Sequence, residues 1–244
     1  MADDAAFNTA ALAGLMRATR PPKPAYPGFF VTFEGTDGSG KGTQIDLLVE
    51  RLRGEGRDVV VNREPGGTPI GKQIRAILLD AANTHLQPTA ELLLYFASRA
   101  QAVEDVILPA LRAGSVVISD RFTDSTTVYQ GAARGLGAEV VVLLDALSCQ
   151  GLVPDLTILL DIDLDTSIAR AAARNAESGS RETRMDEESR EFHAKVREGY
   201  LALARAHPER IRVVNGDRDS ESVAREIAEL LEGSSGGNGP GLRG

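Results

Sequence analysis

The stretch GTDGSGKGT, residues 35–43, has the composition and spacing of a phosphate-binding loop. The pattern Gly-x-x-x-x-Gly-Lys runs from Gly35 to Lys41. Glycines allow backbone N–H groups to turn inward, and a following helix would direct the positive end of its dipole at the same point. Lys41 would bridge the outer phosphates. A glycine-rich turn without a ligand is the alternative, but the order strand, loop, lysine, helix favours phosphate binding.

A magnesium site is expected beside this loop. Gly42 stands where the pattern usually has Ser or Thr, and the hydroxyl comes one residue later, at Thr43. Asp120 ends the apolar run SVVISD, where a carboxylate can reach Mg²⁺ or its waters, although an aspartate there can also cap the next turn. We expect Asp120, and Thr43 through water, to hold Mg²⁺ together with phosphates and further water.

Two arginines have neighbours that would suit a second ligand. Arg121 follows Asp120 directly and would offer a forked donor to a second phosphate; a surface ion pair is the alternative. Tyr95 and Arg99 are four residues apart in a helical pattern, so they share a face. They could hold a planar base, although from spacing alone a core tyrosine with a surface arginine is the more common arrangement.

Residues 170–186 are rich in arginine, with Arg170, Arg174, Arg181 and Arg184. A solvated charged helix is the usual meaning of such a run. In a phosphate-binding protein the segment can instead be a mobile lid, which brings arginines onto a transferring phosphoryl group and excludes water.

Apolar runs alternate with helical patterns along the chain and would position these residues. Five runs are typical of buried strands: GFFVTFEG, RDVVVN, SVVISD, LTILLDID and IRVVNG. The helical stretches between them include residues 41–56, 90–114 and 180–206. This alternation predicts an α/β fold with a mostly parallel five-stranded sheet and helices on both faces. Functional groups should collect at the carboxyl ends of the strands.

Composition limits where the protein acts and what it binds. The 244 residues carry a formal net charge of −8 and a single cysteine, which argues against broad nucleic-acid or membrane-surface binding and against internal disulfides. No stretch approaches the ~20 apolar residues of a membrane span, and Asp3 and Asp4 stand where a signal peptide would be positive. We expect a cytoplasmic protein with neither a nucleic-acid polymer nor a membrane as partner.

The two ends of the chain differ from its middle. Residues 1–27 combine an Ala-rich piece with a proline-rich linker, and we expect an extension that either binds a partner or lacks fixed order. Residues 28–232 form the one expected domain. Residues 233–244, GSSGGNGPGLRG, have the composition of a flexible tail.

Seven motifs in series resemble the thymidylate kinase (dTMP kinase) family across residues 28–231: FEGTDGSGKGTQ, REPGGTPIG, IRAILLD, YFASRAQ, DRFTDSTTVYQG, PDLTILLDID and TRMDEESREFHAKVREGY. The resemblance implies the phosphate-loop (P-loop) kinase fold and transfer of the γ-phosphoryl group of ATP to dTMP, giving dTDP in dTTP synthesis. It also implies a homodimer.

The same resemblance implies two sets of binding residues. ATP would be held by Gly35, Thr36, Asp37, Gly38, Ser39, Gly40, Lys41, Gly42 and Thr43. The acceptor dTMP would be held by Asp37, Glu64, Pro65, Arg75, Tyr95, Arg99, Arg121, Thr126, Tyr129 and Gln130. Tyr95 would stack on thymine where relatives more often have Phe, and Tyr129 would crowd the 2′ position of the sugar.

Catalysis is expected from Lys41, Asp37, Arg121 and one arginine of the lid. The phosphate loop contains no arginine, so the resemblance implies the bacterial type, in which the lid supplies this charge. The candidates are Arg174, Arg181 and Arg184, of which Arg184 in TRMDEES fits the family pattern best.

Other functions remain open from the sequence. The phosphate loop does not choose the acceptor, so a kinase for another small molecule is one alternative, although YFASR and DSTTVYQG favour dTMP. A nucleotide-dependent switch is another, but the chain has no Asn-Lys-x-Asp motif for reading guanine. A catalytically inactive relative is the third.

Overall fold

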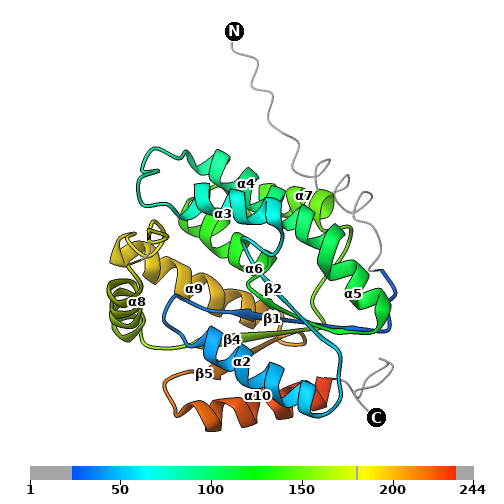
Figure 1. Cartoon of the computed structure of the whole chain (residues 1–244). Coiled ribbons are helices and arrows are strands. Elements are labelled where there is room, and N and C mark those ends of the chain that lie inside the picture. Colours follow the sequence, from blue (N-terminus) through cyan, green and yellow to red (C-terminus); the bar gives the residue numbers. More distant parts are fainter. Residues whose placement is uncertain (1–23, 180, 235–244) are drawn as a thin grey trace.

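Figure 1 shows the computed structural model, which describes residues 24–179 and 181–234. At its centre is a five-stranded sheet with the order β2-β3-β1-β4-β5, in which every neighbouring pair is parallel. The strands are β1 (Phe29–Glu34), β2 (Val59–Arg63), β3 (Val116–Asp120), β4 (Leu156–Asp161) and β5 (Ile211–Asn215). The expected α/β fold is confirmed, with its strands at the five apolar runs.

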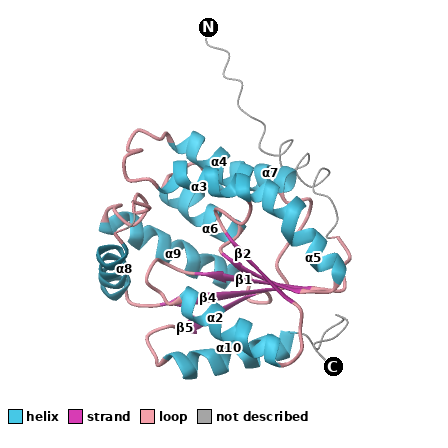
Figure 2. Cartoon of the chain, viewed as in Figure 1, coloured by secondary structure: helices cyan, strands magenta, loops and turns pink. Residues whose placement is uncertain are grey.

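Two helices cover one face of the sheet. They are α2 (Lys41–Gly54) and α10 (Ser220–Ser234), drawn below the strands in Figure 2. Ile45, Leu48 and Leu52 of α2 are buried in a cluster with Phe33 and Ile158 of the sheet. Full burial of one such side chain stabilises the fold by ~1.5–3 kcal/mol, so this apolar face fixes α2, and with it the loop before it, against β1.

Helices also pack on the opposite face. Phe30 of β1 packs edge-on against Phe122 with ring centroids 5.1 Å apart, and Leu159 of β4 is buried with Val196. Helices outside the α2 and α10 layer are α3 (Pro69–Leu79), α4 (Pro88–Ala102), α5 (Leu108–Ala113), α6 (Thr123–Thr126), α7 (Ala138–Ser148), α8 (Leu164–Ser178) and α9 (Arg190–Ala206), with the π-helical segments η1 (Val103–Ile107) and η2 (Thr127–Ala133). Helices therefore cover both faces, as predicted.

Some expected boundaries move. The helix expected over residues 180–206 begins only at Arg190, because Ser189 caps it by accepting a hydrogen bond from the Phe192 amide, and residues 181–189 form turns. Helix α10 continues through Ser234, into the stretch expected as a tail. The rest of that tail, and the Ala-rich piece near the N-terminus, lie outside the described residues.

The last residues of the expected N-terminal extension pack on the domain. Tyr26 is partly buried against the cluster that contains Phe30, and its hydroxyl donates to Asp155 Oδ2 at 3.5 Å. None of the described helices combines the length and the apolar character needed to cross a membrane.

Candidate active site

A cavity of about 930 Å³ lies at the carboxyl edge of the sheet. The segments that follow β1, β2 and β3 contribute Asp37, Glu64 and Arg121 to its wall. Because the strands are parallel, the segments that leave them meet at one edge, which brings together residues distant in the sequence. The volume suits a small-molecule site.

The loop after β1 wraps around the side chain of Lys41. Its Nζ donates to the carbonyl oxygens of Gly35 at 3.0 Å and Thr36 at 2.9 Å. Gly35 has φ +137°, and a Cβ there would lie 2.4 Å from the Leu160 carbonyl oxygen, so this turn requires glycine. No side-chain cap covers the start of α2 at Gly40, and residues 40–43 line the cavity. An uncapped helix start facing a cavity is an anion-binding arrangement.

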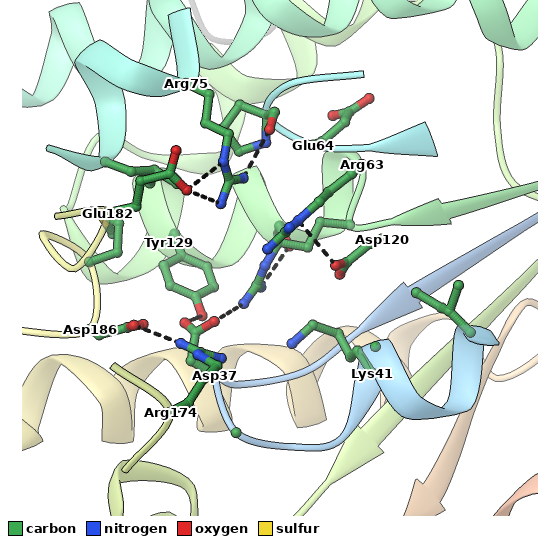
Figure 3. Close-up of a pocket in the computed structure, with 18 of the residues that line it drawn as sticks. Asp37, Lys41, Arg63, Glu64, Arg75, Asp120, Tyr129, Arg174, Glu182 and Asp186 are labelled. Atoms are coloured by element: carbon green, nitrogen blue, oxygen red, sulfur yellow. Dashed lines mark hydrogen bonds and ion pairs between the residues drawn. The ribbon is translucent and has the colours of Figure 1, made fainter. Parts of the chain in front are cut away.

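Asp37 balances two cations in the cavity. Arg121 Nη2 donates to Asp37 Oδ1 at 2.9 Å. Burial would raise the pKa of Asp37, but Arg121 and then Lys41 outweigh burial and hold this pKa well below its usual value. Burial, followed by repulsion from Arg121, lowers the pKa of Lys41 to about 8. Asp37 and Lys41 are therefore mainly charged at neutral pH. Figure 3 shows both side chains at the cavity.

Asp120 and Thr43, the expected magnesium ligands, both line the cavity. Asp120 Oδ1 is buried and has no hydrogen-bond partner in the described part of the chain, while Oδ2 lies 3.8 Å from Arg63 Nε. Within residues 24–179 and 181–234, no group of three or more His, Cys, Asp or Glu side chains forms a metal cage. A carboxylate oxygen without a donor, together with a nearby hydroxyl, suits Mg²⁺ that takes its other ligands from phosphates and water.

A buried ion pair forms part of the cavity wall between α4 and the loop after β2. Arg99 Nε donates to Glu64 Oε2 at 2.6 Å, and the two side chains are only 1% and 3% exposed. Arg99 Nη1 has no hydrogen-bond partner among the residues the structure describes. The alternative of a surface arginine on α4 is therefore wrong. Tyr95 is partly exposed and lines the same cavity.

The remaining residues expected on the acceptor side also line the cavity: Pro65, Arg75, Thr126, Tyr129 and Gln130. Tyr129 donates from its hydroxyl to Asp37 Oδ2 at 3.3 Å, a contact visible in Figure 3. Gln130 Nε2 donates to Glu91 Oε1 at 2.9 Å, which orients the amide. Arg75 Nη1 donates to the Pro65 carbonyl at 3.0 Å, and its Nε bonds Glu182. The side chains of Tyr129, Gln130 and Arg75 are thus each held by another protein group.

The three lid arginines occupy different surroundings. Arg174 lines the cavity and pairs with Asp186 at 2.7 Å. Arg184, the best fit to the sequence pattern, instead points into the protein, where its Nη1 lies 2.7 Å from Glu91 Oε2. Arg181 is 76% exposed and pairs with Asp80. Neither Arg184 nor Arg181 lines the cavity, against expectation. Glu91 is fully buried and needs cationic partners, which accounts for the position of Arg184.

Sequence reasoning missed the residues that hold Arg121 on the side away from Asp37. Ser125 and Tyr200 accept hydrogen bonds from Arg121 Nη1, and Glu34 accepts from both of their hydroxyls. Glu34 is fully buried, and burial followed by repulsion from Asp124 raises its pKa to about 7. A carboxylate at the end of the apolar run FFVTFE was the available signal, because an ionisable residue in a buried strand needs a partner. Tyr200 gave no such signal, since only the fold brings α9 to β3.

Comparison with known proteins shows that the chain is similar to thymidylate kinases. Residues 33–227 match the family model described as thymidylate kinase. The thymidylate kinase of Citrifermentans bemidjiense is 52% identical over 205 residues, which are 84% of this chain and 91% of that protein. That of Geobacter sulfurreducens is also 52% identical over 205 residues, 84% of this chain and 96% of that protein.

A solved structure gives the same likeness. The crystal structure of thymidylate kinase from Ehrlichia chaffeensis is 33% identical in sequence and superposes with a TM-score of 0.67. The match covers 84% of this chain and 99% of that one. The family model, which matches residues 33–227, includes every residue that lines the cavity, from Asp37 to Asp186.

Replacing Glu64 by Ala should lower the free energy of unfolding by about 3–5 kcal/mol, because Arg99 would keep a buried charge without a counter-ion. Urea unfolding followed by circular dichroism measures the change. The matched control is Arg190→Ala, which breaks an exposed pair with Asp165 and should cost less than about 1 kcal/mol. Equal costs for the two variants would show that Glu64 is not needed to balance Arg99.

Proposed function

The chain belongs to the thymidylate kinase family, and from that premise we propose that it transfers the γ-phosphoryl group of ATP to the 5′-phosphate of dTMP, giving dTDP in dTTP synthesis. The observation that carries the proposal is one cavity that joins the phosphate loop, Arg121 and the wall with Tyr95 and Arg99. Transfer between two phosphates requires both to be held in line within one site, and phosphate-binding groups border this cavity on two sides.

On the donor side, residues 35–43 bind the ATP phosphates. Backbone amides at the start of α2 face the anion, and Lys41 places a positive charge where negative charge moves during transfer. Lys41 Nζ is already held by two loop carbonyls, so the ammonium group is fixed before ATP arrives. Asp120, and Thr43 through water, would hold Mg²⁺, which neutralises phosphate charge when bound.

On the acceptor side, Arg121 binds the dTMP phosphate and Asp37 lies between it and the sugar. Arg121 offers a planar fork of donors, which matches phosphate oxygens. The Tyr129 hydroxyl donates to Asp37, and the Tyr129 ring centroid lies 5.1 Å from Arg121 Cζ. These two contacts fix the ring where it can exclude a 2′-hydroxyl. Arg75 and the Glu64–Pro65 turn complete this wall.

The base is read by Tyr95, Arg99 and Gln130, with Thr126 beside them. Arg99 Nη1 has no hydrogen-bond partner among the described residues and lies in the cavity wall, so it can donate to a carbonyl oxygen of thymine. Gln130 donates from Nε2 to Glu91, so Oε1 of Gln130 remains to accept a hydrogen bond from the N3–H of thymine. Cytosine has no N3–H and presents an amino group in place of O4, so it would leave both residues unsatisfied. This pattern favours dTMP over other acceptors.

Repulsion between the donor and acceptor phosphates is offset by Lys41, Arg121 and an arginine of residues 170–186. Of the three candidates Arg174, Arg181 and Arg184, Arg174 is the one that lines the cavity, and we assign the last role to it. Arg170 also lines the cavity, but it lies 3.5 Å from Asp217 and is not one of the candidates. These cations act in a cavity that excludes most water, where charges interact strongly. Catalysis then rests on positioning and electrostatics, with no covalent intermediate on the protein.

The biological unit we propose is a cytoplasmic homodimer. Apolar side chains are exposed on α7 and on α4, which packs beside it: Leu93 is 51% exposed, Val140 44% and Leu147 79%. Large apolar side chains gathered on neighbouring helices are typical of a surface that another protein covers. A second copy of this chain is the occupant that the family resemblance favours. Cytoplasmic location follows from the substrates, which belong to the nucleotide pool.

A coupled ADP-release assay with ATP and Mg²⁺ should show strong turnover with dTMP and weaker turnover with dUMP, which lacks only the methyl group. Turnover with dCMP, dGMP, AMP and thymidine should be negligible. Cytosine and adenine lack the N–H beside a carbonyl that Gln130 and Arg99 would bond, and guanine has that pair but on a larger, two-ring base. Thymidine lacks the phosphate that Arg121 would bind. Preference for another acceptor would overturn the pocket assignment. Absence of turnover with every acceptor would favour the switch or the inactive relative.

Lys41→Ala and Arg121→Ala should each lower kcat with dTMP by about two to four powers of ten, since each removes a charge that faces a phosphate. Circular dichroism and thermal unfolding verify that the variants fold. The control is Arg112→Ala, which removes an exposed arginine of α5 that does not line the cavity, and its kcat should match the wild type. Normal turnover in either Lys41→Ala or Arg121→Ala would refute the role given to that residue.

Light scattering after size-exclusion chromatography should give about twice the chain mass of 25.9 kDa. Leu147→Asp should shift the protein towards the monomer, because it places a charge in an interface that for a stable dimer buries about 1,200–2,000 Å². The matched control is Val213→Asp on β5, a strand at the edge of the sheet, where the side chain is also exposed. A wild-type monomer, or no effect of Leu147→Asp, would contradict the assigned surface.

A further inference from the structure

Arg121 has a backbone conformation that residues other than glycine rarely adopt. Its φ is +72°, in the left-handed region. Such strain persists only where surrounding groups hold the residue in place. The Arg121 amide donates to the Phe33 carbonyl at 2.9 Å, which ties the backbone to β1. The guanidinium contacts four side chains, those of Asp37, Ser125, Tyr129 and Tyr200.

Tyr200 differs from the other three because it does not line the cavity. It lies on α9, the helix after residues 181–189, and is only 3% exposed. Arg121 Nη1 donates to the Tyr200 hydroxyl at 3.0 Å. A guanidinium cannot accept a hydrogen bond, so the Tyr200 hydroxyl must donate its own hydrogen bond to another group. The Tyr200 hydroxyl donates to Glu34 Oε2 at 2.8 Å.

Glu34 fixes the far end of this hydrogen-bond chain. It is the last residue of β1, the central strand, and it is completely buried. Its Oε1 accepts from the Phe122 amide at 2.8 Å, while its Oε2 also accepts from the Ser125 hydroxyl. Ser125 Oγ also lies 2.7 Å from the Tyr200 hydroxyl, but a carboxylate is the stronger acceptor, so the orientation with the proton on Glu34 is favoured and leaves the lone pairs of the hydroxyl facing Arg121.

We propose that Tyr200 is a positioning residue for phosphoryl transfer, whose hydroxyl, anchored by Glu34, directs the Arg121 guanidinium at the acceptor phosphate. The inference rests on the proposed role of Arg121 in binding that phosphate. Tyr200 does not line the cavity, so in this assignment its effect on dTMP passes through Arg121. Asp37 accepts from Nη2 of the guanidinium and Tyr200 accepts from Nη1, so the two contacts together fix the direction of the two terminal nitrogens.

Tyr200→Phe isolates the hydroxyl with little disturbance of the fold. The ring stays in its cluster, where it packs edge-on against Tyr129 with centroids 6.2 Å apart. The Tyr200 hydroxyl has three hydrogen-bond partners, Arg121, Glu34 and Ser125, the last at 2.7 Å. All three keep another contact, because Ser125 accepts from Arg121 Nη1 at 3.1 Å and also donates to Glu34. No buried group is therefore left without a partner, which is the usual cause of unfolding after such a change.

The experiment is a double-mutant cycle of Tyr200→Phe and Arg121→Ala, with KM measured separately for dTMP and ATP. Tyr200→Phe should lower kcat/KM for dTMP about 10- to 100-fold, the range for a lost hydrogen bond to a charged group, and leave KM for ATP within about twofold. In the Arg121→Ala background the same change should alter kcat/KM for dTMP less than about twofold, since the residue through which it acts is gone.

The control Tyr26→Phe removes a hydroxyl that also bonds a carboxylate but lies outside the cavity, and it should behave as the wild type. A kcat/KM for dTMP in Tyr200→Phe equal to the wild type would overturn the inference. So would an equal loss in both backgrounds, or a matching rise in KM for ATP. Each of these failures leaves wild-type turnover intact, whereas a wild type that does not phosphorylate dTMP would overturn the proposed function and this inference with it.

Discussion

The contact between Arg121 and Asp37 is the constraint on which the cavity depends. Arg121 and Lys41 bring two positive charges to adjacent loops, and without the carboxylate between them each would lower the stability of the other's charged form. Asp37 follows β1 and Arg121 follows β3, strands that pair from Phe29 with Val116 to Phe33 with Asp120. A shift of one residue in this register would move Arg121 by ~3.3 Å and turn its side chain to the other face.

Buried carboxylates support the cavity wall from behind. Glu34 holds Tyr200 and Ser125, Glu64 holds Arg99, and Glu91 holds Gln130. These three carboxylates are at most 5% exposed. An unpaired charge in such a place costs several kcal/mol, so every donor that faces a carboxylate is kept in position whether or not a ligand is bound. The side chains proposed to read phosphate and base are therefore oriented before substrate arrives, which reduces the entropy lost on binding.

Local patterns in the sequence predicted most of the fold and the centre of the site. Five apolar runs predicted five strands, and because parallel strands share one carboxyl edge, the loop with Lys41 and the residue Arg121 were expected to meet there. The surroundings of these residues were not predictable. The burial of Arg99 on α4 depends on Glu64 in the loop after β2, and Tyr200 reaches Arg121 across 79 residues of sequence. Single-sequence patterns report the period of one segment and carry no information about such partners.

The positions of Arg174 and Arg184 favour Arg174 as the proposed lid arginine, although Arg184 fits the sequence pattern better. For Arg184 to reach a phosphate it must leave Glu91, a fully buried carboxylate, at a site where its own side chain is only 9% exposed. Separating such a pair costs far more than separating an exposed one. Arg174 is 53% exposed, and its partner Asp186 has a pKa raised by burial and then by repulsion from Asp37. Asn175 Nδ2 also donates to Asp186 Oδ2 at 2.8 Å, so this carboxylate keeps a hydrogen-bond partner if Arg174 turns to an incoming phosphate. Arg174 is therefore the arginine that we propose moves onto the transferring group, while Arg184 stays paired with Glu91, which also holds Gln130.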